Sequence, residues 1–453
     1  MSGNEGTATP AEPDQPPAPR RPVVLRYVDD WDELAGQIAA DRAVGLRASP
    51  VRDAVTAWFD PGSFVETGTL ARRAATSYRG GDTLDDATPE TIPADGLVAG
   101  WGRLRGRLVF VAADDPALGS PVRGGAGAAK AGRMRHHALA QGAPIVQILG
   151  AARLEPGMFI GAEAVRFGYG LNLDFEAGAA RRILKIAIVT HPITEQAALE
   201  AGWCHLILLV GPHGAIEGLA GDDALAAGLA DAHCPDLPAA LAEVGRALDR
   251  LPPSWTDEPP AGGEAGPWSF ALWPHWRPEA STVLATPGHP SGPSGRQVPA
   301  GGPVAGRADL ADGVVLDAGV AAKVARLARF CAAFSLPLVL VHWGWSLPSP
   351  PGQADIDGVR RLGEALAQCP AVVEVAHGPP QLGSVWGLRP TVALAVAGPG
   401  NGNPDDREAD AVVAPHEAPA AVAAALAALA VARPARHDDP RLRHQLPRGL
   451  QSS

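Results

Sequence analysis

Two stretches of this chain, one in each half, share one pattern of residues. Ala129-Lys130-x-x-Arg133 is followed by Pro144, and Ala322-Lys323-x-x-Arg326 is followed at the same spacing by Pro337. The two copies lie much farther apart than the period of about 20–50 residues typical of solenoid repeats, so they predict a duplicated α/β half instead. Such a duplication can place one site at the junction of its two halves.

Each half has the order of elements expected for an α/β fold. Residues 130–141 and 323–334 predict helices, and each is followed by a continuous apolar run, Pro144–Leu149 or Pro337–Val341. Runs of this kind are typical of buried strands in parallel sheets. A looser repeat aligns Ile186–His191 with Val372–His377. Alternating strands and helices predict a sheet built with crossover connections.

Composition divides the chain into five parts. We expect a Pro-rich disordered arm and lead-in over residues 1–44, an amino half over 45–250 and a Pro/Gly-rich linker over 251–303. A carboxy half follows over 304–435, and a tail over 436–453. The segment from Met1 to Pro22 is rich in proline and has no apolar core, so we expect no secretory signal there.

The charge and the cysteines exclude several classes of function. The chain has 38 Lys and Arg against 49 Asp and Glu, a net charge of −11, which argues against nucleic acid or an anionic membrane as a partner. The longest apolar runs, such as Leu206–Val210, are far shorter than the ~20 residues of a membrane span. The four cysteines are far apart and form no C-x-x-C, so we expect no metal site and reduced thiols in a cytoplasmic protein.

Five segments, in order, carry a resemblance to a known family: Phe59–Glu66, Asp95–Gly102, Gly313–Asp317, Lys323–Val339 and Ala409–Pro415. They resemble the carboxyltransferase (beta) subunits of biotin-dependent acyl-CoA carboxylases of the acetyl- and propionyl-CoA type. The resemblance implies two crotonase-like halves, each a ββα superhelix. It also implies oligomers in which the amino half, receiving acyl-CoA, faces the carboxy half of another chain, receiving carboxybiotin.

The resemblance also implies an oxyanion hole of backbone N–H groups in each half. Glycine lets the backbone approach a ligand closely, and losing one such donor costs about 100–1000-fold in rate. The positions that match these loops are Gly150, Ala151, Gly344 and Gly383, which we therefore expect to be catalytic. Substrate contacts are expected from Ala152 and Arg153, and from the Gly-rich loop Gly124–Lys130, in particular Gly124, Gly125 and Lys130. That loop lacks the Walker spacing.

The chain departs from the family pattern at several of these loops. Glu195 and Gln196 stand where the family has small residues, and Pro379 and Pro380 replace a Gly pair. Proline has no N–H to donate. The first strands of the carboxy half also look absent, displaced by the linker. We therefore expect altered or reduced carboxyl transfer.

Several side chains have two open interpretations. His191 and His377 could flank a ligand as acid/base groups near their working pKa, or could be histidines that bind backbone at the start of a loop. His342, beside Trp343 and Trp345, could be a repurposed catalytic group or part of a packed aromatic corner. The basic residues of the two repeats could contact CoA phosphates or form a solvated helix face.

The predicted function is that of an acyl-CoA carboxyltransferase-like enzyme that binds an acyl-CoA or related thioester. No Ala-Met-Lys-Met biotin motif is possible, because the only methionines are Met1, Met134 and Met158. We therefore expect no cofactor bound on this chain, with carboxybiotin on a partner protein. That partner would be a biotin carboxylase or biotin carrier subunit, or a second carboxyltransferase chain. The alternative is a non-catalytic paralogue that stabilises such a complex.

Overall fold

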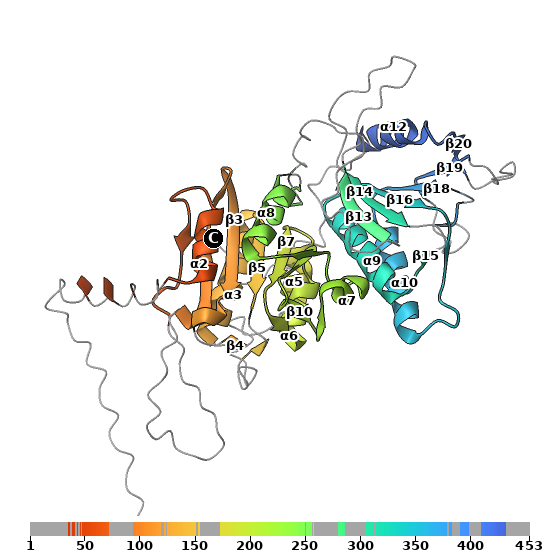
Figure 1. Ribbon diagram of the computed structural model, residues 1–453. Coiled ribbons are helices and arrows are strands. Elements are labelled where there is room, and N and C mark those ends of the chain that lie inside the picture. The colour runs from red at the N-terminus through yellow and green to blue at the C-terminus, as the bar shows by residue number, and fades with distance from the viewer. Residues whose placement is uncertain are drawn as a thin grey trace, which may run out of the picture.

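The computed structural model describes the two halves of the chain with gaps between segments. The described residues are 35–36, 39–40, 43, 46, 48–71, 94–118, 122–123, 125–150, 153–154, 173–249, 251–255, 257, 280–285, 305–310, 314–377, 380–382, 390–397 and 409–431. Figure 1 shows a large sheet in each half, with helices packed on it. None of the helices in this part of the chain is long and apolar enough to cross a bilayer.

The amino half is built on a seven-stranded sheet of order β1-β2-β3-β5-β7-β9-β12. Its strands are β1 (Val65–Glu66), β2 (Leu97–Leu104), β3 (Arg107–Asp114), β5 (Ile145–Leu149), β7 (Lys185–Val189), β9 (Leu206–Val210) and β12 (Ala232–Cys234). The first three are antiparallel, and from β3 onward the pairs are parallel. Strands β5, β7 and β9 are buried at every residue, as their continuous apolar runs predict.

The carboxy half repeats this arrangement in a six-stranded sheet of order β13-β14-β16-β18-β19-β20. Its strands are β13 (Ala280–Ala285), β14 (Ala305–Leu310), β16 (Leu338–His342), β18 (Val372–Ala376), β19 (Val392–Val396) and β20 (Ala411–Val413). Here too the first pair is antiparallel and the remaining pairs are parallel. The strand order and directions match those from β2 to β12, which confirms the duplication.

The repeat holds at the level of single residues. The first residues of helices α3 (Gly125–Gln141) and α9 (Ala318–Ala333) are as far apart in the sequence as the first residues of β5 and β16. The same sequence separation relates Lys130 to Lys323. Strand β18 begins at Val372 and strand β7 begins at Lys185. The sequence alignment instead pairs Val372 with Ile186, one residue after Lys185. The ladders therefore make Thr190, and not His191, the counterpart of His377. The predicted equivalence of His191 and His377 is wrong by one position, because apolar strands align equally well in neighbouring registers.

The prediction that the carboxy half lacks its first strands is also wrong. Strand β13 lies inside the predicted linker and pairs along its whole length with β14. Its core, Ser281-Thr282-Val283, is rich in β-branched residues, which favour strands. Composition averaged over the whole Pro- and Gly-rich stretch conceals a strand this short.

Helices cover both sheets. The other α-helices of the described residues are α2 (Pro50–Trp58), α5 (Leu173–Ala180), α6 (Glu195–Gly202), α7 (Gly221–Ala226), α8 (Leu237–Leu248), α10 (Gln353–Gln368) and α12 (Ala418–Val431). On the carboxy sheet, α9 and α10 face the amino half and α12 packs on the other side (Figure 1). One hydrophobic core contains Val189 and Leu209 of the amino sheet together with Val324 of α9 and Leu340 of β16. The two halves therefore share a core.

The repeated basic residues of α9 lie at this junction between the halves. Arg326 donates from Nη1 to Oδ1 of Asp231 over 2.7 Å, and Nζ of Lys323 donates to the Asp231 carbonyl over 3.3 Å. Lys323 has no exposed surface. The hypothesis of a solvated helix face is wrong for these two residues, because the amino half covers them and supplies the counter-ion that a buried charge requires. In α3, Arg133 is exposed, as that hypothesis predicts.

Candidate functional site

Several candidate site residues lie at or just after the carboxyl ends of the parallel strands, at one edge of the sheet in each half. In α/β sheets, ligands bind outside these strand ends. Short ladders continue from them: β4 (Val122–Arg123) with β6 (Arg153–Leu154), β8 (Pro192–Ile193) with β10 (Ala215–Ile216) and β11 (Leu219–Ala220), and, in the carboxy half, β15 (Val314–Val315) with β17 (Trp345–Ser346). The ladders fix the loops that carry the candidate residues.

Gly150 occupies a tight corner directly after β5. A Cβ at this position would lie 2.9 Å from Oγ1 of Thr190 and 3.2 Å from the Pro116 ring, so the close approach of these loops requires glycine. The Gly150 N–H donates to Oδ2 of Asp114, the last residue of β3, over 3.2 Å. The amide predicted to serve as an oxyanion donor is thus engaged with a carboxylate of the same half.

Thr190 and His191 follow β7 and form a chain of hydrogen bonds with β5. The Thr190 hydroxyl donates to the Leu149 carbonyl over 3.3 Å, and Nδ1 of His191 lies 3.1 Å from the same hydroxyl oxygen. The exposed ring of His191 is stacked near that of His213, which follows β9, with centroids 6.4 Å apart. Partial burial, and after it the neighbouring His213 imidazole, lowers the pKa of His191.

The start of α3 contains a similar engagement of a backbone amide by a carboxylate. The Gly127 N–H donates to Oδ2 of Asp95 over 2.6 Å. Helix N-termini attract anions, and here an acidic side chain of the chain itself takes that position. Nζ of Lys130 donates to the carbonyls of Ala94 and Leu97, the latter over 2.5 Å. Burial lowers the pKa of Lys130 to about 8.

These contacts give Lys130 a role that the sequence did not suggest. It is 3% exposed and ties α3 to the start of β2, so the hypothesis of a solvated face is wrong for Lys130 as well. A contact between Lys130 and substrate stays a prediction, and the structure places its ammonium group inside the fold.

His342, the last residue of β16, is fully buried. The Gly344 N–H donates to Nδ1 over 3.2 Å, and Nε2 lies 3.0 Å from Oε1 of Glu374 in β18. A nitrogen that accepts a hydrogen bond carries no proton, so Nε2 carries the proton and donates to the carboxylate. The His342 ring also packs against the Trp345 ring in a tilted arrangement, with centroids 4.6 Å apart and an angle of 37° between the ring planes. This geometry matches the interpretation of His342 as part of a packed aromatic corner.

Glu374 joins the two loops of the carboxy edge. Its Oε1 also accepts from the N–H groups of Gln381 and Leu382, over 2.7 and 3.0 Å, and the Trp345 N–H donates to Oε1 of Gln381 over 2.9 Å. The second carboxylate oxygen of Glu374, Oε2, is buried and has no hydrogen-bond partner among the described residues. The backbone donors of both loops are thus directed at side chains of the same half. A glutamate inside an otherwise apolar buried strand was the sequence signal for this cluster.

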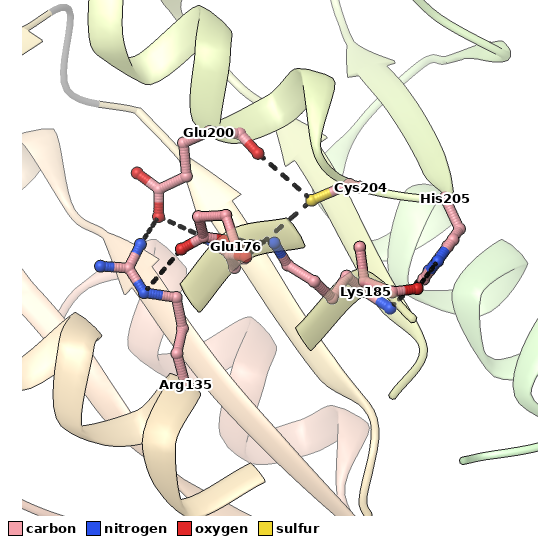
Figure 2. A network of polar contacts seen from close by, with 8 residues as sticks. Arg135, Glu176, Lys185, Glu200, Cys204 and His205 are labelled. Atoms are coloured by element: carbon pink, nitrogen blue, oxygen red, sulfur yellow. Dashed lines mark hydrogen bonds and ion pairs between the residues drawn. The ribbon is translucent and has the colours of Figure 1, made fainter. Parts of the chain in front are cut away.

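A second buried polar network lies beneath the amino edge (Figure 2). Glu176 of α5 pairs with Lys185 of β7 and, at 3.4 Å, with Nε of Arg135 from α3. Arg135 and Gln147 also donate to Glu200 of α6. All of these side chains are buried. The network ties three helices to the sheet, and sequence reasoning missed it because its members are widely scattered along the chain.

Some of the predicted site residues lie outside the described part of the chain. These are Gly124, Ala151, Ala152 and Gly383. Gly125 begins α3 and Arg153 begins β6, but only their backbone is described; the same holds for Glu195 and Gln196, the first residues of α6. No group of three metal-ligating side chains occurs among the residues that the structure describes.

Comparisons with known proteins agree with the resemblance. A family model for the carboxyl transferase domain matches residues 49–227. The chain is 32% identical over 109 residues to the mitochondrial propionyl-CoA carboxylase beta chain of Homo sapiens, covering 24% of this chain and 19% of the relative. It is 27% identical over 161 residues to methylmalonyl-CoA decarboxylase subunit alpha of Veillonella parvula, covering 35% of this chain and 29% of that subunit. The matched region thus spans less than a third of these curated relatives.

Solved structures extend the likeness over nearly the whole chain. Hexameric transcarboxylase 12S with hydrolysed methylmalonyl-coenzyme A matches with a TM-score of 0.64 at 18% identity, over 90% of this chain and 96% of that one. A single-chain, multi-domain long-chain acyl-CoA carboxylase matches with a TM-score of 0.61 at 17% identity, over 88% of this chain and 49% of that one. At this level of identity the likeness shows the fold, and the predicted duplicated crotonase-like fold is confirmed.

Proposed function

We propose that this chain, a divergent relative of the carboxyltransferase subunits of acyl-CoA carboxylases, binds an acyl-CoA or related thioester at the carboxyl edge of its amino half. The observation that carries the proposal is the match of the carboxyl transferase domain to residues 49–227, which include Gly150, Thr190 and His191. Relatives that match part of this chain are named for their action on propionyl-CoA and methylmalonyl-CoA. The thioester group would lie beside the loop that follows β5.

We further propose that carboxyl transfer is reduced or altered in this protein. The engagement of the Gly150 and Gly344 amides by Asp114 and His342 supports this view, since an oxyanion donor must point at the ligand. Any carboxyl group transferred would come from carboxybiotin on a partner subunit. We place the protein in the cytoplasm and in a homo- or hetero-oligomer, as in the hexameric transcarboxylase core.

A second candidate function is that of a non-catalytic paralogue that stabilises a carboxylase complex. The observation that favours it is the position of Glu374 at the edge of the carboxy half. Its Oε1 accepts hydrogen bonds from two backbone N–H groups, which are then not available to an oxygen of a ligand. Purification from the native host distinguishes the two candidates. A paralogue of this kind copurifies with a second carboxyltransferase chain and binds no thioester alone.

Calorimetric titration with short acyl-CoAs tests the leading proposal. We expect saturable binding of acetyl-, propionyl- or methylmalonyl-CoA to the full chain, and weaker binding by Arg153→Ala, because Arg153 begins the strand β6 next to the Gly150 loop. Arg360→Ala, at an exposed ion pair on α10, is the control and should bind like the unmodified chain. Absence of CoA binding at millimolar ligand would refute the proposal.

A further inference from the structure

The hydrogen bonds around His191 determine which of its ring nitrogens is free. The only hydroxyl proton of Thr190 is directed at the Leu149 carbonyl, so the Thr190 oxygen can only accept from His191. Nδ1 of the neutral imidazole therefore carries the proton, and Nε2 has a free lone pair. A histidine held in one tautomer by a second group is the usual arrangement of a general base.

The position of the ring suits a reaction with a bound thioester. His191 is exposed, and it follows Thr190, whose hydroxyl lies 2.9 Å from the position of a Cβ on Gly150. None of the described residues makes a hydrogen bond to Nε2 of His191. Water can thus reach this nitrogen at the edge where the proposed function places the thioester.

We propose that Nε2 of His191 is the general base for hydrolysis of a bound acyl-CoA thioester, an activity that needs no biotin. This inference rests on the proposed function, because it requires acyl-CoA at this edge. Nε2 takes a proton from water as the water oxygen bonds to the thioester carbon. The carbon–sulfur bond then breaks, and the departing CoA sulfur takes the proton back from the imidazolium. The products are free CoA and the carboxylic acid.

The neighbours of His191 have separate parts in this reaction. Thr190 is a positioning residue that holds Nδ1. His213 is the titratable group that faces the ring from the turn after β9, and it lowers the pKa of His191. A general base acts in its unprotonated form, so the hydrolysis rate should rise with pH through a value below the ordinary 6.5 of histidine and then level off. His213→Gln should move this rise to higher pH.

The test measures free CoA released from propionyl-CoA and methylmalonyl-CoA by the full chain without biotin or ATP. His191→Asn keeps a donor for Thr190 but has no basic nitrogen, and we expect its rate to fall about 100-fold or more, the usual contribution of a general base. His416→Asn, at an exposed histidine of the carboxy half, should have no effect. Thr190→Val should lower the rate, and Thr190→Ser should restore it.

Calorimetry on the same variants separates failure of the inference from failure of the proposed function. If acyl-CoA binds but is not hydrolysed above the buffer rate, or if His191→Asn hydrolyses it normally, the role of His191 is overturned while thioester binding stands. If no variant binds acyl-CoA, the proposed function fails, and the inference fails with it. Binding with hydrolysis that depends on His191 supports both.

Discussion

Given a carboxybiotin carrier and propionyl-CoA, the chain is expected to transfer the carboxyl group at least ~1000-fold more slowly than a relative with intact glycine loops. Carboxyl transfer develops negative charge in both halves, and each lost oxyanion donor costs about 100–1000-fold. Gly150 donates to Asp114, Pro380 has no N–H, and Gln381 donates to Glu374. The measurement is incorporation of labelled carboxyl into the acyl-CoA in single turnover.

The control for this experiment is acyl-CoA binding by the same preparation, which must be intact for the slow rate to be meaningful. Asp114→Asn tests one cause separately, because it removes a negative charge next to the Gly150 amide and should raise the residual rate. Turnover of propionyl-CoA at ~1–100 s⁻¹, ordinary for an enzyme, would contradict this account of the loops.

Replacing Lys185 by Met is expected to destabilise the protein by about 3–5 kcal/mol, the usual cost of removing one partner from a buried ion pair. Lys185 and Glu176 are each 1% exposed at the side chain, so Glu176 would be left buried with Arg135 as its remaining cation. Denaturant unfolding of the full chain, followed at the first transition, measures the loss.

Two further variants make this prediction specific. Lys185→Met combined with Glu176→Leu should recover much of the stability, since a buried pair can be replaced by apolar residues at little cost. Arg360→Met, which breaks an exposed ion pair with Glu364 on α10, should cost less than ~1 kcal/mol. Equal losses for Lys185→Met and Arg360→Met would show that burial of the network does not matter.

The sequence predicted the fold well where a pattern repeats or a strand is continuously apolar. The repeat that relates Lys130 to Lys323 located β5 and β16 to within one residue, and it located α3 and α9 except for their first turns, since both helices begin about five residues before the predicted start. Prediction failed where tertiary contacts decide the outcome. Lys323 and Arg326 look like a solvated face within their own helix and become buried only because the amino half covers them. Strand register is likewise set by ladder pairing, which apolar residues alone do not specify.

The candidate site was only partly accessible to sequence reasoning. Gly150 and His342 were identified, but their partners Asp114 and Glu374 are distant in the sequence. Such pairs form only when neighbouring strands are aligned in the sheet. Which ring nitrogen of His191 is free depends on one hydrogen bond, between Nδ1 and the Thr190 hydroxyl oxygen. Residue types and spacing contain no information on that geometry.

The central claim is that an acyl thioester binds at the carboxyl edge of the amino half, and hydrogen–deuterium exchange with and without propionyl-CoA tests it most directly. We predict that saturating ligand slows exchange at the backbone amides of Thr190, His191, Ile193, Gly211, His213 and Gly214. Exchange at the amides of Gly344, Trp345, Gln381 and Leu382, which donate within the carboxy half, should not change. Protection confined to those carboxy-half loops, with none around His191 and His213, would contradict the account.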